Sequence, residues 1–323
     1  MDHVGFSIYN RLLLGDKLAL HDLAIEGDEP EQVFPGVLDR IAGLIDAVSA
    51  LGIRVGGTLH LCDVGLIRQE FVRQSWLDAV AAWKNRSFLL GYHVNYAHEN
   101  LPLAPGFLKT FRDAARDCNQ LGVDAMVVHA PLLTTENTDA SFVSEVTSEP
   151  FIDAMRACNA TVCWENAQDP AARYKRLDML LAWRDMLVQE LERLGHGELT
   201  KRHQFCLDTG HLLLAIQRDG VEKSHADHYL PAFAKHVKVF HVHVNDGTAD
   251  QHVLPFTDAR IVPQAPKVVN PARLDKNSRI VERWLRICDE HKDVANRHVH
   301  LEASSPAPFT EMVAFYKRYY SSR

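Results

Sequence analysis

The strongest constraint on the fold is an alternation of short apolar runs with longer amphipathic stretches, which continues along all 323 residues. Apolar residues in the longer stretches recur at spacings of three and four, which is typical of helices with one buried face. The runs predicted as strands are Val4–Tyr9, Arg54–Leu61, Ser87–His93, Ala125–His129, Ala160–Glu165, Gln204–Asp208, Val237–Val244 and Arg297–Glu302. The stretches predicted as helices are Val37–Leu51, Gln69–Lys84, Pro105–Gln120, Ser141–Asn159, Ala171–Leu194, Ala226–His236, Asn270–Glu290 and Pro308–Tyr319.

Eight strand–helix units in a chain of this length predict an α/β fold of one kind, a single (β/α)8 TIM barrel. An open α/β sheet is the alternative. It is disfavoured because no glycine-rich GxGxxG turn follows the first strand and no P-loop is present. No repeat, linker or low-complexity tract interrupts the pattern, so we expect one domain over residues 1–323. The connections Gly195–Arg202 and Phe256–Pro271 are predicted to be insertions, the second an active-site loop.

Composition narrows the class of protein. Apolar residues make up 46% and charged residues 24%, as in soluble globular proteins, and no apolar run is long enough to span a membrane. The six cysteines contain no CxxC pair, which indicates reduced thiols, and the start of the chain has no signal-peptide pattern. We therefore expect a cytoplasmic protein. The net charge of −7 provides no overall basic surface for nucleic acid, although bound cations would offset it locally.

Candidate metal ligands end six successive predicted strands. The catalytic residues of TIM barrels lie at the carboxyl ends of the strands. Here these ends carry imidazole and carboxylate groups, the donors that bind Zn²⁺, Mn²⁺ or Fe²⁺. Carboxylates buried there are costly unless they are paired or metal-bound. The residues in chain order are His93, His129, Glu165, Asp208, His243 and Glu302. Six ligand types in phase are explained most simply by one joint metal site.

The other histidines among the 18 in the chain carry less information. His60 is interpreted as structural. His241 and His300 precede candidate ligands by two residues, so they point the same way but deeper into the barrel, and are interpreted as packing or supporting histidines. The histidines interpreted as surface or helix residues are His98, His225, His228, His236, His291 and His298.

The order of these residues resembles the xylose isomerase-like TIM-barrel superfamily and, within it, is most similar to endonuclease IV, the family-2 apurinic/apyrimidinic endonuclease. The resemblance covers strands three to eight. It rests on Asp208-x-x-His211 and His243-x-Asn245-Asp246, with Asp250-x-His252 as the part specific to the nuclease branch. Three segments depart from the family: the link from Asp246 to Asp250 is short, no glycine-containing continuation follows His252, and the first strand lacks the family's usual histidine-and-glycine start.

The resemblance implies three bound ions. The histidine-rich donor set without thiolates predicts two to three, with zinc expected and manganese or iron as alternatives. One ion would be held by His93, His129 and Glu165. A second would be held by Glu165, Asp208, His243 and Glu302. The third would be held by His211, Asp250 and His252. Glu165 would bridge two ions, as two-metal phosphoesterase sites require.

Two functions compete at this stage. The first is a metal-dependent hydrolase that cleaves a phosphodiester, in abasic-site DNA or a related phosphoester, with hydroxide generated at the metals. Glu165, Asp208 and Glu302 are its expected catalytic residues, and Tyr96, Asn166 and Asn245 are expected to bind substrate. The second is a divalent-metal-dependent sugar isomerase or epimerase, or a related sugar lyase. There Glu165 and Glu302 would form the acid–base pair and a small sugar would be the substrate.

Overall fold

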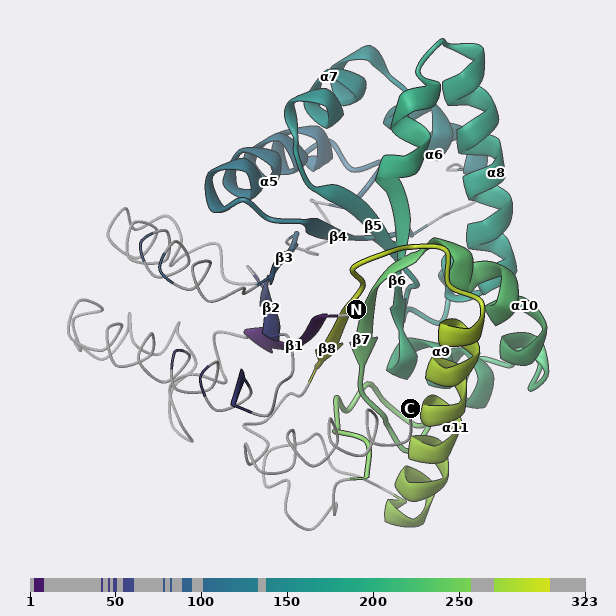
Figure 1. Cartoon of the computed structure of the whole chain (residues 1–323). Helices are drawn as coiled ribbons and strands as arrows, with labels where there is room; N and C mark the ends of the chain where they lie inside the picture. The colour runs from purple at the N-terminus through teal and green to yellow at the C-terminus, as the bar shows by residue number, and fades with distance from the viewer. Residues whose placement is uncertain are drawn as a thin grey trace, which may run out of the picture.

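The computed structural model describes residues 3–8, 55–60, 89–94, 101–132, 138–256 and 270–302, together with a few isolated positions between 42 and 82. Eight parallel strands hydrogen-bond in sequence order, and the last pairs with the first, so the sheet is a closed barrel. Figure 1 shows the strands at the centre, with the described helices packed outside them. The predicted TIM barrel is confirmed.

The strands agree with the predicted runs to within a few residues at each end. Their bounds are β1 His3–Ile8, β2 Val55–His60, β3 Leu89–His93, β4 Ala125–His129, β5 Thr161–Glu165, β6 His203–Asp208, β7 Val237–Val242 and β8 His298–Leu301.

The helices within the described residues follow the apolar periodicity, with two internal breaks. Predicted helix 141–159 divides into α6 and α7, because Ser148 and Pro150 start a new helix there. The first part of predicted helix 171–194 is a short 3-10 turn, η3. The bounds are α5 Phe107–Leu121, α6 Asp139–Val146, α7 Glu149–Ala157, η3 Arg173–Lys175, α8 Leu177–Arg193, η4 Gly197–Arg202, α9 Thr209–Gln217, α10 His225–Phe233, η5 Ala234–His236 and α11 Pro271–Glu290.

Several sequence expectations change or lie outside the described residues. The predicted insertion at 195–202 is largely the 3-10 helix η4, which contacts α8. Predicted helix 308–319 and nearly all of the predicted loop 256–271 lie outside the described residues, as do Tyr96 and most of predicted helices 37–51 and 69–84.

The strands alternate between two kinds of side chain. Residues that point outward, such as Val162 and Trp164 of β5, join the large core between the sheet and the helices. Residues that point inward form a separate small core of Ala125, Val127, Cys163, Cys206 and Val239. The next inward positions towards the carboxyl ends carry the imidazole and carboxylate groups, so the barrel interior changes from apolar to ionisable along its axis.

Candidate metal centre

All nine predicted ligand positions lie in the described part of the chain and gather at the carboxyl end of the barrel. Their donor atoms fall into groups in which every pair of atoms is within 4.8 Å. The first group matches its predicted ligand set, whereas the second and third differ from theirs in the places of His241 and His243.

The first group consists of His93 at the end of β3, His129 at the end of β4 and Glu165 at the end of β5. One carboxylate oxygen of Glu165, Oε2, lies 3.2 Å from His93 Nε2 and 2.9 Å from His129 Nε2. His93 and Glu165 are both buried. The pairing of these three residues agrees with the ligand set that the resemblance implied.

The second group contains Glu165, Asp208 and Glu302 together with His241. His241 Nδ1 lies 2.7 Å from Glu165 Oε1, 3.5 Å from Glu302 Oε2 and 4.0 Å from Asp208 Oδ2. The two oxygens of Glu165 therefore face different groups. The resemblance implied His243 here, and the sequence indicated a packing or supporting role for His241. The fully buried ring of His241 lies among three carboxylates.

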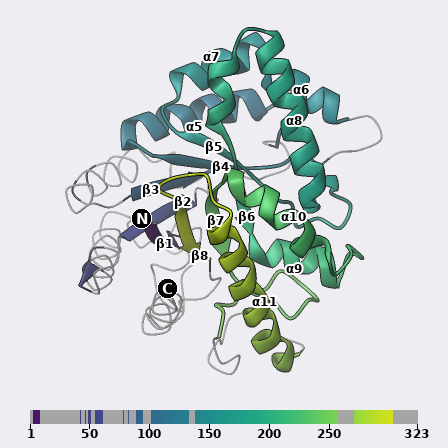
Figure 2. The ribbon, with the colours of Figure 1, turned by 45° about the vertical axis from the view of Figure 1, so that its right-hand side comes forward.

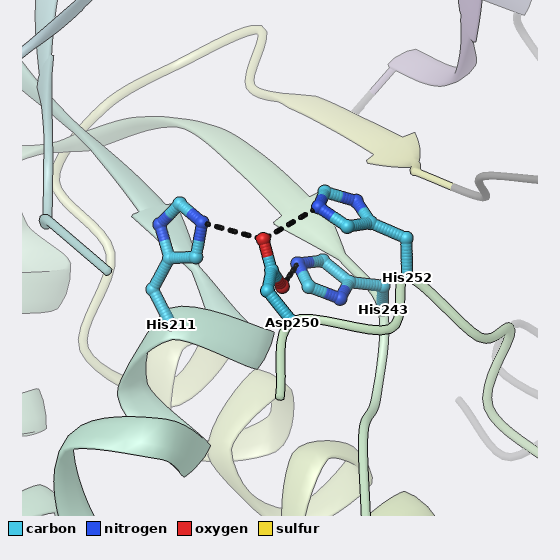
Figure 3. Close-up of side chains that lie close together, drawn as sticks. All are labelled: His211, His243, Asp250 and His252. Atoms are coloured by element: carbon cyan, nitrogen blue, oxygen red, sulfur yellow. Dashed lines mark hydrogen bonds and ion pairs between the residues drawn. The ribbon is translucent and has the colours of Figure 1, made fainter. Parts of the chain in front are cut away.

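The third group brings His243 together with His211, Asp250 and His252. Figure 3 shows the carboxylate of Asp250 between the three imidazole rings. Its oxygens lie 2.8 Å from His252 Nε2, 3.6 Å from His211 Nε2 and 3.9 Å from His243 Nε2. The rings of His243 and His252 stack with their centroids 4.1 Å apart. His243 also lies 3.0 Å from Asp208 Oδ1, so it borders the second group.

The spacing Asp208-x-x-His211 has a local structural cause. Asp208 is the N-cap of α9, and its Oδ1 accepts a hydrogen bond from the backbone N–H of His211 at 2.7 Å. The same carboxylate thus starts the helix and faces the site. Gly210 lies between them beneath the His243 ring, where a Cβ atom would overlap that ring. Only glycine leaves room for His243 in this position.

A short closed loop carries Asp250 and His252. Val244 and Val253 pair across its base through two backbone hydrogen bonds of 2.7 and 3.0 Å. Inside the loop, the side chain of Gln251 accepts a hydrogen bond from the backbone N–H of Asp246 at 2.7 Å. His252 has a φ of 45°, a left-handed conformation uncommon for residues other than glycine. The short connection noted in the sequence therefore folds into a defined turn that presents both side chains.

Asn166 and Asn245 have structural contacts. The Asn166 side chain accepts a hydrogen bond from Asp208 N at 2.7 Å and donates one to Asp208 O at 3.0 Å. Asn245 donates to Gly210 O at 2.9 Å and accepts from Gly247 N at 3.0 Å. Both side chains are fully buried and hold the backbone of the site. These contacts leave the predicted role in substrate binding without support, and Tyr96 lies outside the described residues.

The hydrogen bonds of the site residues fit a divalent metal ion. Nδ1 of His93 donates to Val94 O, and Nδ1 of His211 donates to Asn166 O, both at 2.8 Å. Metal-binding histidines usually donate one ring N–H in this way, which fixes the ring and directs the other nitrogen to the metal. Here both Nε2 atoms point towards carboxylates of the site. The donors therefore converge as ligands of a cation would.

The electrostatics point the same way. Burial opposes ionisation of Glu165, but the charges and hydrogen bonds of His129 and His241 outweigh it and hold the pKa well below its ordinary range. Burial of His252 acts to lower its pKa, but the charge and hydrogen bond of Asp250 outweigh burial and raise the pKa to about 9. The raised pKa of His252 thus reflects the negative charge of the carboxylate beside it. A divalent cation would offset the same negative charge.

Cys206 also has its sulfur within the same 4.8 Å limit of donor atoms on Glu165 and His241, a proximity that the sequence analysis missed. Burial, with the nearby carboxylates, raises the pKa of this thiol well above its ordinary value. Cys206 belongs to the small inner core one layer below the site, and we assign it to packing. Its period-two spacing from Asp208 along β6 was the available sequence signal.

No family model and no curated protein matches the sequence. Solved structures do match the fold, over 99% of this chain in each of three cases. The IOLI protein, solved with a bound zinc atom, has 14% identity and a TM-score of 0.59 over 97% of its chain. A D-tagatose 3-epimerase-like protein has 11% identity and a TM-score of 0.57, also over 97% of its chain. Endonuclease IV from Thermus thermophilus has 15% identity and a TM-score of 0.53 over its full length.

The chain shares the TIM-barrel fold of these solved structures. At these identities the likeness establishes the fold and leaves the activity open. Within the described residues, none of the helices of this barrel combines the length and the apolar character that crossing a membrane requires.

Proposed function

We propose that the chain is a metal-dependent hydrolase of phosphodiesters that acts on nucleic acid at abasic sites. The observation that carries this proposal is the separate third group, His211, His243, Asp250 and His252, beside the two groups that share Glu165. A hydrolase that holds two to three ions needs this many donors, whereas one ion needs about four. Zinc suits the nitrogen and oxygen donors, with manganese or iron as alternatives.

Each donor group would hold one ion, and Glu165 belongs to the first and second groups. Glu165 would be shared by two ions, with Oε2 on the His93 and His129 side and Oε1 on the His241 side. Asp250, between three imidazoles, would hold the third. When bound, such ions neutralise a phosphate, stabilise the leaving oxygen and acidify a water molecule. The resemblance of the ligand order to endonuclease IV, also a structural neighbour, supports this substrate class.

A sugar isomerase or epimerase is the second candidate, and one feature favours it. Glu165, Asp208, His241 and Glu302 form a complete single-ion donor set that includes two glutamates. These glutamates could exchange a proton with a carbon beside a carbonyl. Neighbours described as a D-tagatose 3-epimerase-like protein and a D-psicose 3-epimerase share the fold.

The test is a double substitution, Asp250→Ala with His252→Ala, assayed on an abasic-site duplex and on a panel of ketoses and their phosphates. A hydrolase should lose one metal ion and ~10²-fold or more in duplex cleavage, because the third group stabilises transition-state charge. An isomerase should keep sugar turnover, with a modest change mostly in KM.

The matched control is His291→Ala with Asp293→Ala, an exposed His-x-Asp pair beyond α11. It removes the same two side-chain types and should leave metal content and rate unchanged. The hydrolase proposal would be replaced by the isomerase if two results were found together. The native protein would leave the duplex uncut, and the Asp250/His252 variant would retain sugar turnover.

A further inference from the structure

A cavity of about 440 Å³ lies outside the barrel between α9, α10 and α11. These helices gather on the same side of the barrel in two views (Figures 1 and 2), and α10 and α11 are in direct contact. Its volume is within the range of pockets that bind small molecules. None of the candidate metal ligands lines it, so it is distinct from the site described above.

The charges around this cavity are strongly unbalanced. Four cationic side chains line it, Lys223, Arg273, Lys276 and Arg283, against one acidic side chain, Asp227. Arg283 forms an ion pair with Asp227 at 2.5 Å. Within the described residues, no carboxylate forms an ion pair with the other three cations. A local excess of positive charge in a chain of net charge −7 is a feature that would attract an anion.

The wall behind these cations is apolar. It is formed by Leu213 and Ile216 of α9 and by Ile280 and Trp284 of α11. Lysine and arginine side chains bind phosphate oxygens through charge-assisted hydrogen bonds, and an apolar wall gains from contact with a ring or a hydrocarbon. The combination fits a molecule with an anionic end and an apolar or aromatic part.

The cavity is connected to the loop that carries Asp250 and His252. Asn277, at the cavity wall, donates to Asn245 O at 2.7 Å and accepts from Gln217 at 2.8 Å. Arg273 donates to Asp246 O at 3.5 Å. Anything bound against Arg273 and Asn277 would therefore lie next to the backbone that supports the third metal group.

We propose that this cavity is a binding site for an organic phosphate with an apolar or aromatic part, of about the size of a nucleoside monophosphate. The phosphate would lie against Lys223, Lys276 and Arg273, and the rest against Ile280 and Trp284. The site does not depend on the metals. Its occupancy would restrain residues 245–253 through Asn277 and Arg273.

Isothermal titration calorimetry with adenosine 5′-monophosphate, inorganic phosphate and adenosine tests the proposal. It uses the full chain carrying Asp250→Ala and His252→Ala, which weakens competing phosphate binding at the third metal group. The nucleotide should bind more tightly than phosphate or adenosine alone. Adding Lys223→Glu and Lys276→Glu should weaken nucleotide binding by about tenfold or more, since two phosphate partners become repulsive.

The matched control adds Lys201→Glu and Lys235→Glu, two exposed lysines outside the cavity, with the same change in net charge. It should keep the nucleotide affinity within about twofold. Equal affinity of the Lys223/Lys276 variant and the control would overturn the proposal, as would absence of nucleotide binding. If the nucleotide binds at this cavity but the native protein does not cleave the duplex, only the proposed hydrolase function is overturned.

Discussion

Both ends of the barrel are rich in histidine, but the two ends use it differently. At the amino end, His298 of β8 and Lys238 of β7 share one carboxylate, Asp124, at 2.9 and 2.7 Å. At the carboxyl end, the single carboxylate of Glu165 lies near three histidines, His93, His129 and His241. The amino-end carboxylate has its counter-charge on the chain itself. At the carboxyl end several donors converge on shared points, which is the arrangement that a cation completes.

His298 illustrates the difference in detail. The expectation that His298 is a surface or helix residue is wrong, because it lies in β8 and its side chain is fully buried. His225 is in a helix as expected but is also buried, and its Nε2 accepts a hydrogen bond from Leu177 N at the start of α8. Buried histidine alone is therefore no sign of a metal site in this barrel. Convergence of several donors is the informative feature.

The largest effect is expected from Glu165→Gln. The change keeps the shape of the side chain but removes the charge that three histidines share, so the first two groups should both lose metal affinity. We expect phosphodiester cleavage to fall by ~10³-fold, with metal content measured per chain by elemental analysis. Glu149→Gln, an exposed change in α7, is the control. Full metal content in the Glu165 variant would show that Glu165 does not bridge ions.

Substituting His241 of β7 and His243, which follows β7, separates the second and third groups. If His243 serves the third group, His243→Asn should remove little further metal once Asp250→Ala and His252→Ala are present. His241→Asn in that background should remove about one more ion, because it acts on a different group. Metal content after dialysis is the measurement. The opposite pattern would restore the partition implied by the resemblance, with His243 in the second group.

Gly210→Ala tests how tightly the site is packed. The new Cβ would overlap the buried His243 ring, so that ring must move. Although alanine favours helix more than glycine does, we expect about tenfold weaker metal binding at the third group. Gly197→Ala is the matched control, because its Cβ would meet its nearest neighbour, Glu192 Cγ, at an ordinary 3.7 Å. Equal metal affinity in the two variants would contradict the packing argument.

The sequence predicted the barrel and the location of the site because both follow from local patterns. Period-two alternation fixes which strand residues face inward, and the barrel brings their carboxyl ends together. The partition of donors could not be predicted. His241, in β7, and His243, just after it, are two residues apart and so are expected to face the same way. Which carboxylates each one contacts depends on the tertiary structure. The contacts of Asn166 with Asp208 likewise join residues 42 positions apart. The single-domain boundary at 1–323 stays a prediction.

The smallest expected effect concerns the amino end, through the pH dependence of stability. Burial lowers the pKa of His203 from 6.5 to about 3, and Nδ1 of its ring accepts a hydrogen bond from Trp164 at 3.1 Å. Between these two pH values the unfolded chain binds a proton that the folded chain does not. The free energy of unfolding should therefore fall as the pH drops below 6.5, by up to about 1.4 kcal/mol per pH unit from this group.

Glutamine at position 203 keeps an acceptor for the Trp164 N–H but does not titrate. His203→Gln should therefore reduce the slope of the free energy of unfolding against pH by the contribution given for His203. Urea unfolding of chelator-treated protein between about pH 7 and pH 5 measures it without a contribution from metal release. His291→Gln, an exposed histidine, should leave the slope of the native protein unchanged. If the native and His203→Gln proteins lose stability in parallel, His203 takes up its proton in the folded state as well. The protonation of His203 would then not oppose folding. The contrast with a histidine such as His252, whose pKa is raised by its carboxylate partner Asp250, would fail at this residue.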